Sequence, residues 1–232
     1  MRTSLVRMLA VVTGAGRGFG AALVECLAAG GWDVVACVRT EPAAAPPHDR
    51  VRTVVQDVRE PVGAQLLAAV GERPLDVLVN NAGIGAPGRP LAGVDPQTIL
   101  GAVDVNVAGP LRLAQALLPR LLAAPAPLIV NVTSRLGSLS AQAAGEFAGR
   151  GTSYAYRIAK AAQNMLTIAL AQELSGRVRC WAVHPGSLTT AMGAAGATTS
   201  PHDAATRLVR LLRSPDPASP RYLSLDGGDL PW

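Results

Sequence analysis

The chain has 232 residues, 49% of them hydrophobic, and a formal net charge of +5. No apolar run reaches the ~18 residues of a membrane-spanning helix, so we expect no such helix and no membrane partner. The positive charge raises nucleic acid as a partner, but the arginines are spread along the chain. Only Arg207, Arg210 and Arg213 approach a stripe at helical spacing. We interpret them as a solvated helix face and expect no nucleic-acid partner.

The first residues could be mistaken for a signal peptide. Arg2 and Arg7 precede an apolar stretch, but this stretch is short and runs into a glycine turn without a cleavage-type ending. A buried first strand explains it better. Cys26, Cys37 and Cys180 are odd in number and lack metal-ligand spacing, so they predict core thiols of a cytoplasmic protein and no metal site.

Apolar, β-branched segments alternate with longer amphipathic segments along the chain. Strand-like segments lie at 8–13, 33–38, 51–56, 76–81, 127–133, 178–184 and 222–225, and helical patterns at 18–29, 61–71, 96–123, 153–174 and 201–213. This alternation implies right-handed βαβ units and a parallel sheet. The predicted fold class is α/β, with residues 1–232 forming one Rossmann-type domain. Its doubly wound parallel sheet would have about seven strands flanked by helices.

Helix-boundary residues agree with this order of elements. Gly30 follows the first helical pattern, as a C-terminal stop does. Asp95 and Ser200 each stand as an N-cap residue directly before a proline suited to the first helical position. The Ala/Pro-rich residues 40–49 are predicted to form a surface connection.

Ligands of such a sheet bind beyond the carboxyl ends of its strands. The stretch TGAGRGFG (13–20) follows the first strand and fits G-x-x-x-G-x-G on Gly14, Gly18 and Gly20. It does not fit the general G-x-G-x-x-G, whose last glycine would fall on Phe19. Glycines let the backbone approach a pyrophosphate, which the next helix faces with its N-terminus. We predict a dinucleotide site, with an ordinary glycine turn as the alternative.

The residue at the end of the second strand indicates which dinucleotide is bound. An acidic residue there would bind the ribose 2′-hydroxyl, but Asp33 stands at the start of that strand. Arg39 stands at its end, and Arg17 in the glycine turn offers a second cation. Two arginines favour a 2′-phosphate and therefore NADP(H). The alternative is that both are ordinary surface arginines.

Polar residues also follow the third and fourth strands. Asp57 could bond the adenine amino group, and NNAG (80–83) adds two amides along the same edge. Asn80 and Asn81 could equally be turn formers.

The stretch SYAYRIAK (153–160) holds the chain's only lysine, among twenty arginines. Tyr156 and Lys160 are four residues apart and share a helix face, whereas Tyr154 has Ile158 at that spacing. An ammonium beside a phenol lowers the tyrosine pKa from ~10 and makes Tyr156 a plausible acid or base. A hydroxyl to polarise a substrate oxygen could come from Ser134, after the fifth strand. The alternative is a chance spacing.

Together these residues resemble the short-chain dehydrogenase/reductase family over essentially the whole chain. TSYAYRIAK and DGGDLPW further resemble the C-factor-like branch of small carbonyl reductases. The motifs that occur in the family's order are TGAGRGFG, Asp57, NNAG, Asn106 in DVNVAG, Ser134 in VNVTSRLG, Tyr156 and Lys160 in YRIAK, and HPGSLTT (184–190).

The resemblance implies a catalytic tetrad of Asn106, Ser134, Tyr156 and Lys160. Tyr156 would donate a proton to the substrate carbonyl oxygen as hydride arrives from the nicotinamide, and Ser134 would hold that oxygen. Lys160 would lower the tyrosine pKa and bond the nicotinamide ribose. Asn106 would order a water that links Lys160 to solvent.

The resemblance also implies where NADP(H) binds. Thr190 and the backbone after Pro185-Gly186 would fix the nicotinamide carboxamide. The full predicted cofactor set is Gly14, Arg17, Gly18, Phe19, Gly20, Arg39, Asp57, Val58, Asn81, Ala82, Gly83, Tyr156, Lys160, Pro185, Gly186 and Thr190.

We therefore expect an NADPH-dependent reductase of a small ketone or aldehyde, or the reverse alcohol dehydrogenase. The alternatives are an NADP-binding regulatory protein without turnover, and an epimerase or dehydratase. The Ala/Gly-rich insert between Ser134 and Tyr156 and the short segment after Thr190 leave the substrate unidentified. The resemblance further implies a homodimer or homotetramer that assembles through the long helices at 96–123 and 153–174.

Overall fold

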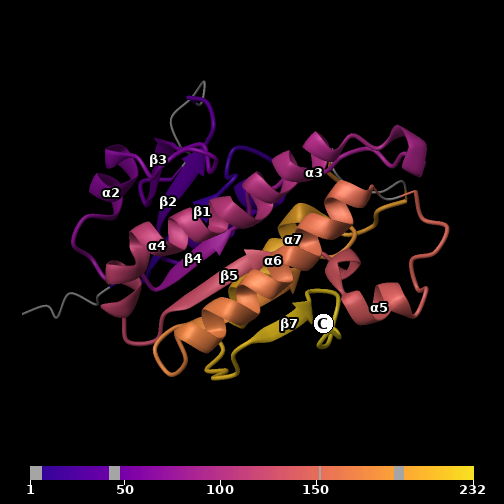
Figure 1. Cartoon of the computed structure of the whole chain (residues 1–232). Helices are drawn as coiled ribbons and strands as arrows, with labels where there is room; N and C mark the ends of the chain where they lie inside the picture. The colour runs from indigo at the N-terminus through magenta and orange to yellow at the C-terminus, as the bar shows by residue number, and fades with distance from the viewer. Residues whose placement is uncertain (1–6, 42–47, 152, 191–195) are drawn as a thin grey trace, which may run out of the picture.

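Seven parallel strands form one sheet in the order β3-β2-β1-β4-β5-β6-β7 (Figure 1). The computed structural model describes residues 7–41, 48–151, 153–190 and 196–232. β1 lies inside the sheet between β2 and β4, so the chain winds outward in both directions and the predicted doubly wound fold is confirmed. The strands are β1 (Leu9–Thr13), β2 (Asp33–Val38), β3 (Val51–Val55), β4 (Val77–Asn80), β5 (Leu128–Val132), β6 (Arg179–His184) and β7 (Arg221–Ser224).

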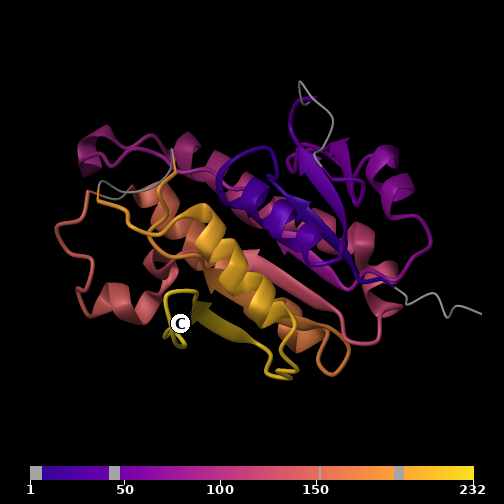
Figure 2. The same cartoon turned by 180° about the vertical axis from the view of Figure 1, so that it is seen from behind.

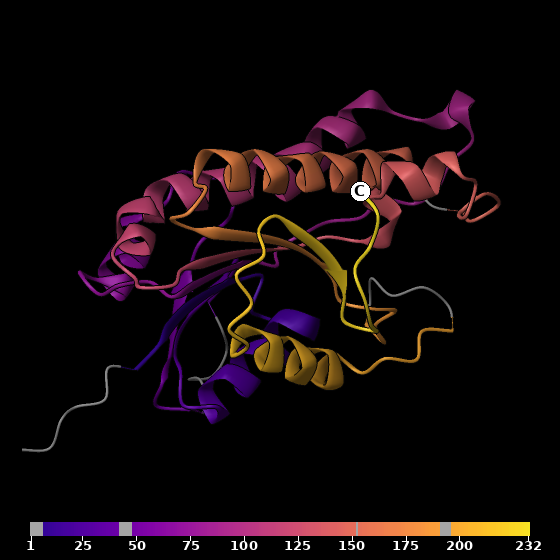
Figure 3. The same cartoon turned by 90° about the horizontal axis from the view of Figure 1, so that it is seen from below.

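Helices cover both faces of this sheet, as the view from below shows (Figure 3). Helices α1 (Gly18–Ala29) and α7 (Pro201–Leu212) pack side by side on the face seen in Figure 2. The opposite face carries α2 (Ala64–Val70), α4 (Gly109–Leu122) and α6 (Tyr154–Glu173). The result is three layers with the sheet in the middle.

The core has two halves because successive strand residues point to opposite faces. Val12 and its neighbours pack with Leu23 of α1 and Leu208 of α7. Val11 packs in the other half, with Leu117 of α4 and the remaining helices of that face. The near-continuous apolar strands of the sequence reflect this burial on both sides.

The predicted helix ends are confirmed. The Asp95 side chain accepts a hydrogen bond from the Gln97 backbone N–H at 2.9 Å and caps α3 (Pro96–Val103). The Ser200 hydroxyl accepts one from the Asp203 N–H at 3.0 Å and caps α7. α1 ends with Gly30 as its C-cap residue.

The helix predicted over 96–123 is interrupted, which corrects that prediction. Between α3 and α4 the chain forms a π-helical turn, η2 (Asp104–Ala108). The Gly109 N–H bonds to the Asp104 carbonyl, five residues earlier. The next residue is Pro110, whose ring would clash with the Asn106 carbonyl in a regular α-helix. The wider π turn avoids that clash and holds Asn106.

Three short elements were not predicted: η1 (Leu91–Gly93), η3 (Arg135–Gly137) and α5 (Leu139–Ala143). Their small, Gly/Ala-rich sequences carry no clear periodicity. The predicted helix 61–71 is shorter, because the Gly63 N–H bonds to the Gln56 side chain at 2.8 Å before α2 begins. Of the predicted connection 40–49, residues 42–47 lie outside the described part of the chain.

The η3 turn lies directly on the backbone of α6 at Gly137. A Cβ atom at this position would come within 2.6 Å of the Lys160 carbonyl carbon and oxygen. The absent side chain is therefore what lets the segment after β5 approach α6.

We predict that Gly137→Ala destabilises the fold by about 1–3 kcal/mol, because the added methyl overpacks against helix backbone that cannot yield. Urea unfolding followed by circular dichroism measures this. Gly101→Ala is the matched control: a Cβ there meets nothing within 4 Å. In the interior of α3 the control should be neutral or stabilising by about 0.5–1 kcal/mol. Equal stability of the two variants would contradict the contact.

Candidate active site

The predicted site residues converge on one edge of the sheet, because parallel strands end on the same side. The glycine turn follows β1, Arg39 follows β2, and Asp57 comes shortly after β3. Asn81, Ser134 and Pro185 follow β4, β5 and β6. Tyr156 and Lys160 reach this edge from the first turns of α6.

The glycine turn is tied to the segment after β4. Gly14 and Gly18 have positive φ values of 64° and 58°, which favour glycine. The Asn81 side-chain nitrogen donates to the Thr13 carbonyl at 2.9 Å and to the Gly14 carbonyl at 3.2 Å. A Cβ on Gly20 would lie 2.3 Å from the Gly14 oxygen. The turn therefore has one well-defined shape.

The N-terminus of α1 is suited to an anion. Arg17 is its N-cap residue, and no side chain caps the helix there. Uncapped backbone N–H groups at a helix start bind phosphate oxygens well. A Cβ on Gly18 would lie 3.4 Å from the Thr190 Cγ2, so the glycine turn and Thr190 are neighbours. Residues 191–195, which follow Thr190, lie outside the described residues.

Thr13 is a further site residue, which the sequence motifs did not indicate. Its hydroxyl oxygen accepts hydrogen bonds from the backbone N–H groups of Asn81 and Ala82, both at 3.0 Å. It thereby joins the ends of β1 and β4. The available signal was a buried threonine at the last position of a strand.

Arg17 and Arg39 flank the same corner of the sheet. The Ala15 N–H donates to the Cys37 carbonyl at 3.0 Å, which holds the glycine turn against the end of β2. Both arginines are exposed. Among the residues that the structure describes, neither guanidinium has a hydrogen-bond or ion-pair partner. The pair is therefore available to a ligand.

Asp57 is engaged by a neighbour that the sequence analysis did not identify. Arg59 donates to its carboxylate, with its terminal nitrogen at 2.6 Å. This hydrogen bond lowers the pKa of Asp57 to about 2, and the charge of Arg39 acts in the same direction. Asp57 is thus ionised and partly occupied within the chain.

Other members of the predicted cofactor set contribute packing. Phe19 and Val58 are buried. A Cβ on Gly109 would lie 2.9 Å from the Val58 Cβ, so the start of α4 packs on Val58. Gly186, with a φ of 93°, packs on Asp226, whose carboxylate a Cβ would meet at 2.7 Å.

Tyr156 and Tyr154 lie in different surroundings, although both begin α6. Tyr154 is 46% exposed, whereas Tyr156 is half-buried. Burial raises the pKa of Tyr156, and a hydrogen bond with the Ser134 side chain offsets part of that rise. Ser134 is itself buried. The structure therefore brings Ser134 together with Tyr156 and leaves Tyr154 at the surface.

Lys160 is buried, with 4% of its surface exposed. Its ammonium donates to the Val132 carbonyl at 2.9 Å and to the Gln163 side-chain oxygen at 2.8 Å. Desolvation lowers the pKa of Lys160 to about 7. The nitrogen lies 5.8 Å from the centre of the Tyr156 ring.

The net shift of the Tyr156 pKa runs opposite to the direction expected from Lys160. We expected the ammonium to lower the phenol pKa, but the pKa of Tyr156 is raised. Burial dominates for the phenol, and the ammonium bonds to Val132 and Gln163 instead.

Asn106 lies within the π-helical turn and faces Lys160 across Gly83. Its side-chain nitrogen donates to the carbonyls of Ala102 at 2.8 Å and Ile84 at 3.1 Å. Its buried oxygen has no partner within the described chain. A Cβ on Gly83 would lie 2.8 Å from that oxygen and 3.6 Å from the Lys160 nitrogen. Gly83 thus leaves a gap between an unused acceptor and the ammonium.

The buried Tyr222, with the half-buried Trp232 against its ring, supports Ser134 from behind. The Tyr222 hydroxyl donates to the Ser134 carbonyl at 2.6 Å. The rings of Tyr222 and Trp232 are 5.1 Å apart, and the Trp232 carbonyl accepts from the Ser140 hydroxyl at 2.6 Å. No local sequence pattern indicates this role of Tyr222, because it depends on a contact between residues far apart in the chain.

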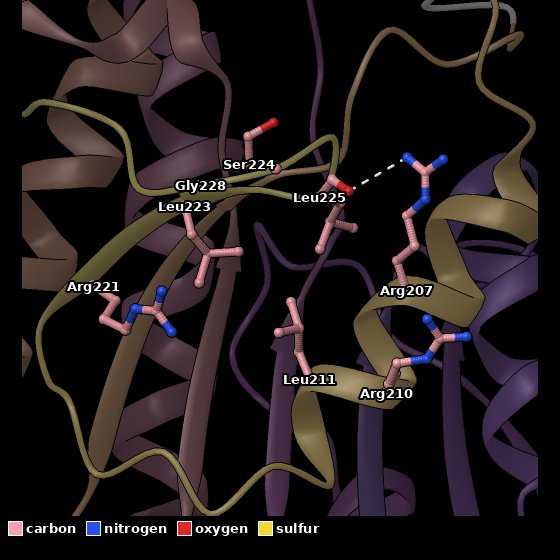
Figure 4. A pocket seen from close by; sticks show the side chains of 9 residues that line it. Arg207, Arg210, Leu211, Arg221, Leu223, Ser224, Leu225 and Gly228 are labelled. Carbon is pink, nitrogen blue, oxygen red and sulfur yellow. Dashed lines mark hydrogen bonds between the residues drawn. The ribbon is translucent and has the colours of Figure 1, made fainter.

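A pocket lies between α7 and β7, away from these residues (Figure 4). Arg207 donates to the Leu225 carbonyl and pairs with Asp226, and Arg221 pairs with Asp216 and Asp229. Its positive charges are therefore largely matched by carboxylates, and the pocket is not a strongly cationic surface.

Within the described ranges, no cluster of three or more His, Cys, Asp or Glu side chains is arranged to hold a metal ion. The helices in those ranges are too short or too polar to cross a membrane.

We predict that the stability of the protein rises with pH just above neutrality. The folded pKa of Lys160, about 7, lies below the ~10.4 of an unfolded chain. Between these values the unfolded state binds more protons, so unfolding becomes harder as pH rises. The free energy of unfolding should increase by on the order of 1 kcal/mol from about pH 7 to about pH 8.5.

Urea unfolding at several pH values tests this, with Lys160→Met as the comparison, since it removes the titrating group. The pH range over which stability should rise ends near pH 8.5. Burial raises the pKa values of Cys37 and Cys180 to about 12, so above that pH the folded state retains protons and loses stability. The same rise in Lys160→Met would assign the effect to another group.

The chain is similar to known proteins in sequence and in fold. Residues 8–200 match the family described as short chain dehydrogenase. C-signal of Myxococcus xanthus is 35% identical over 162 residues, covering 68% of this chain and 93% of that protein. L-xylulose reductase of Mesocricetus auratus is 33% identical over 217 residues, covering 91% and 84%.

Among solved structures, the NADPH-bound carbonyl reductase from chicken fatty liver is similar, with a TM-score of 0.85 and 25% identity. The similarity covers 98% of this chain and 100% of that one. The predicted family is confirmed: the chain belongs to the short-chain dehydrogenase family of nicotinamide-dependent oxidoreductases.

Proposed function

We propose that the protein is an NADPH-dependent reductase of a carbonyl group in a small organic molecule, or the reverse alcohol dehydrogenase. One observation carries this proposal: Ser134, Tyr156, Lys160 and Asn106 lie together at the sheet edge that also holds the glycine turn. One chain would then supply both the cofactor site and the acid–base groups.

The residues present fit a nicotinamide dinucleotide. The uncapped N-terminus of α1 would hold the pyrophosphate, and the positive-φ glycines let it approach the backbone. Thr190, which neighbours Gly18, would contact the carboxamide. When bound, the cofactor supplies the hydride.

The chain's own groups would handle the proton. Tyr156 would protonate the carbonyl oxygen, and the Ser134 hydroxyl would hold that oxygen in place. Lys160 would contact the ribose with the N–H that Val132 and Gln163 leave free. The unused oxygen of Asn106 would order a water beside Lys160.

We further propose that NADPH is preferred, because Arg17 and Arg39 are exposed and lack partners within the described chain. Both would bond the 2′-phosphate. The chicken carbonyl reductase with bound NADPH is a relative in fold that supports this choice.

Arg39→Asp should narrow or invert the preference for NADPH. Charge-assisted bonds to a phosphate contribute about 1.5–3 kcal/mol, so the ratio of kcat/KM for NADPH and NADH should fall at least about tenfold. The measurement is NADPH and NADH oxidation over a panel of aldehydes, ketones and quinones. Arg177→Asp is the control, since Arg177 is exposed at the far end of α6. Equal use of both cofactors by the unaltered protein would refute the preference.

Tyr156→Phe should lower kcat by about 100-fold or more, because general acid catalysis contributes that much. NADPH affinity, measured by fluorescence titration, should change little, since the hydroxyl acts in the transition state. Tyr154→Phe is the matched control and should retain activity. NADPH binding without turnover of any carbonyl by the unaltered protein would instead support a regulatory role.

We also propose a homo-oligomer that uses the outer face of α3 and α6. Leu100, Ile158 and Met165 are exposed there at 60%, 43% and 54%. Multi-angle light scattering should give a mass of two or four chains, and Met165→Glu should reduce it, because a charge in an apolar interface is costly. A monomeric mass for the unaltered protein would contradict this assembly.

The free cysteines agree with a cytoplasmic location, which we propose and which fractionation would test.

A further inference from the structure

Gln163 is buried one turn beyond Lys160 on α6, with none of its surface exposed. Residues three apart on a helix lie on the same side. The Gln163 side-chain oxygen accepts a hydrogen bond from the Lys160 ammonium at 2.8 Å. It is therefore a direct partner of the only lysine of the protein, and the mechanism proposed above does not assign it a role.

Packing alone does not explain a glutamine at this position. Its side-chain nitrogen is buried and has no partner in the described chain. An unpaired buried N–H costs stability, and an apolar side chain would avoid that cost. The ammonium also fixes the orientation of the amide, because a turned amide would place donor against donor.

A chain of buried hydrogen bonds holds the backbone at Gln163 in position. Its backbone carbonyl accepts from the Thr167 hydroxyl at 2.9 Å. That hydroxyl accepts from the Asn131 side chain at 2.9 Å, and Asn131 accepts from Asn80 at 2.9 Å. This buried chain of bonds runs from β4 through β5 to α6. It holds the turn of α6 that carries Gln163 against the sheet.

We propose that Gln163 is a positioning residue for Lys160: its side-chain oxygen stabilises the charged ammonium and directs it so that one N–H remains for the candidate active site. The amide oxygen of Gln163 is neutral, so it accepts the hydrogen bond without forming an ion pair with the ammonium. A carboxylate at this position would form an ion pair. An ammonium has three donors, and Val132 and Gln163 take two of them. The significance of this for catalysis rests on the proposed function.

Few other charged or titratable groups face Lys160. Tyr156 lies on its own helix, with its pKa raised by burial. His184, at the end of β6, is influenced by Lys160 and Arg135, and burial lowers its pKa to about 4. Burial raises the pKa of Tyr222 on β7 to about 12, and the charge of Tyr156 acts in the same direction. The pKa of each of these neighbours is therefore shifted away from neutrality.

The single lysine makes a direct experiment possible. Protein labelled with 13C and 15N only in lysine gives one side-chain signal, whose pH titration reports the pKa of Lys160 without any enzyme assay. Gln163→Leu should shift that pKa down by about one to two units, because a hydrogen bond to a charged group is lost. Gln163→Glu should shift it up, because a carboxylate favours the ammonium. Gln172→Leu, at an exposed position of the same helix, should leave it unchanged.

Two outcomes would overturn the proposal: an unchanged lysine pKa in both Gln163 variants, or equal shifts in Gln163→Leu and Gln172→Leu. Near-UV circular dichroism establishes that each variant is folded. Should Gln163→Leu fail to fold, Gln163→Met and the nearly isosteric Gln163→Glu provide the same test.

Activity is read separately. If Lys160 acts as charged, Gln163→Leu should move the alkaline limb of the kcat/KM profile to lower pH, in step with the lysine pKa. A merely structural role would lower stability without moving that limb. If the signal shifts as expected but no form of the protein oxidises NADPH, the proposed function fails and the positioning role stands.

Discussion

The burial of one ammonium is the constraint on which the candidate site depends. A buried charge must be hydrogen-bonded, and Lys160 finds its acceptors in the Val132 carbonyl of β5 and the side chain of Gln163. The bond to Val132 forms only if α6 lies against β5 in one register, whereas Gln163 lies on α6 itself. The contact of Gly137 with the backbone at Lys160 requires the same register, so the loop that carries Ser134 is placed by the same packing.

The other half of the site is built mainly from backbone. Thr13 and Asn81 bond the ends of β1 and β4 to each other, and the glycine turn lies between them. Glycine is needed at position 14 because a Cβ there would come within 2.8 Å of the Ala82 Cα. The cofactor half thus depends on close main-chain packing, and the acid–base half depends on buried hydrogen bonds.

The sequence predicted the layered fold well, because alternating apolar strands and amphipathic helices are local patterns that survive folding. It also identified Arg39, Ser134 and Tyr156 as residues of one sheet edge, since topology alone brings strand ends together. It could not find the π-helical turn at Asn106, which depends on the strain that Pro110 introduces. Nor could it find Tyr222, whose partner Ser134 lies far away in the chain, or Gln163, whose bond to Lys160 forms because both side chains are buried on one side of α6.

The direction of the tyrosine pKa has a chemical consequence for the proposed reaction. A phenol whose pKa is raised keeps its proton at neutral pH, and that is the form that reduction of a carbonyl consumes. Oxidation of an alcohol begins from the phenolate, which the same burial disfavours. Lys160, with a pKa of about 7, can change charge over the pH range in which Tyr156 stays protonated. Of Tyr156 and Lys160, the lysine is therefore the residue whose charge responds to pH near neutrality. An arginine stays charged and could not replace it in that role.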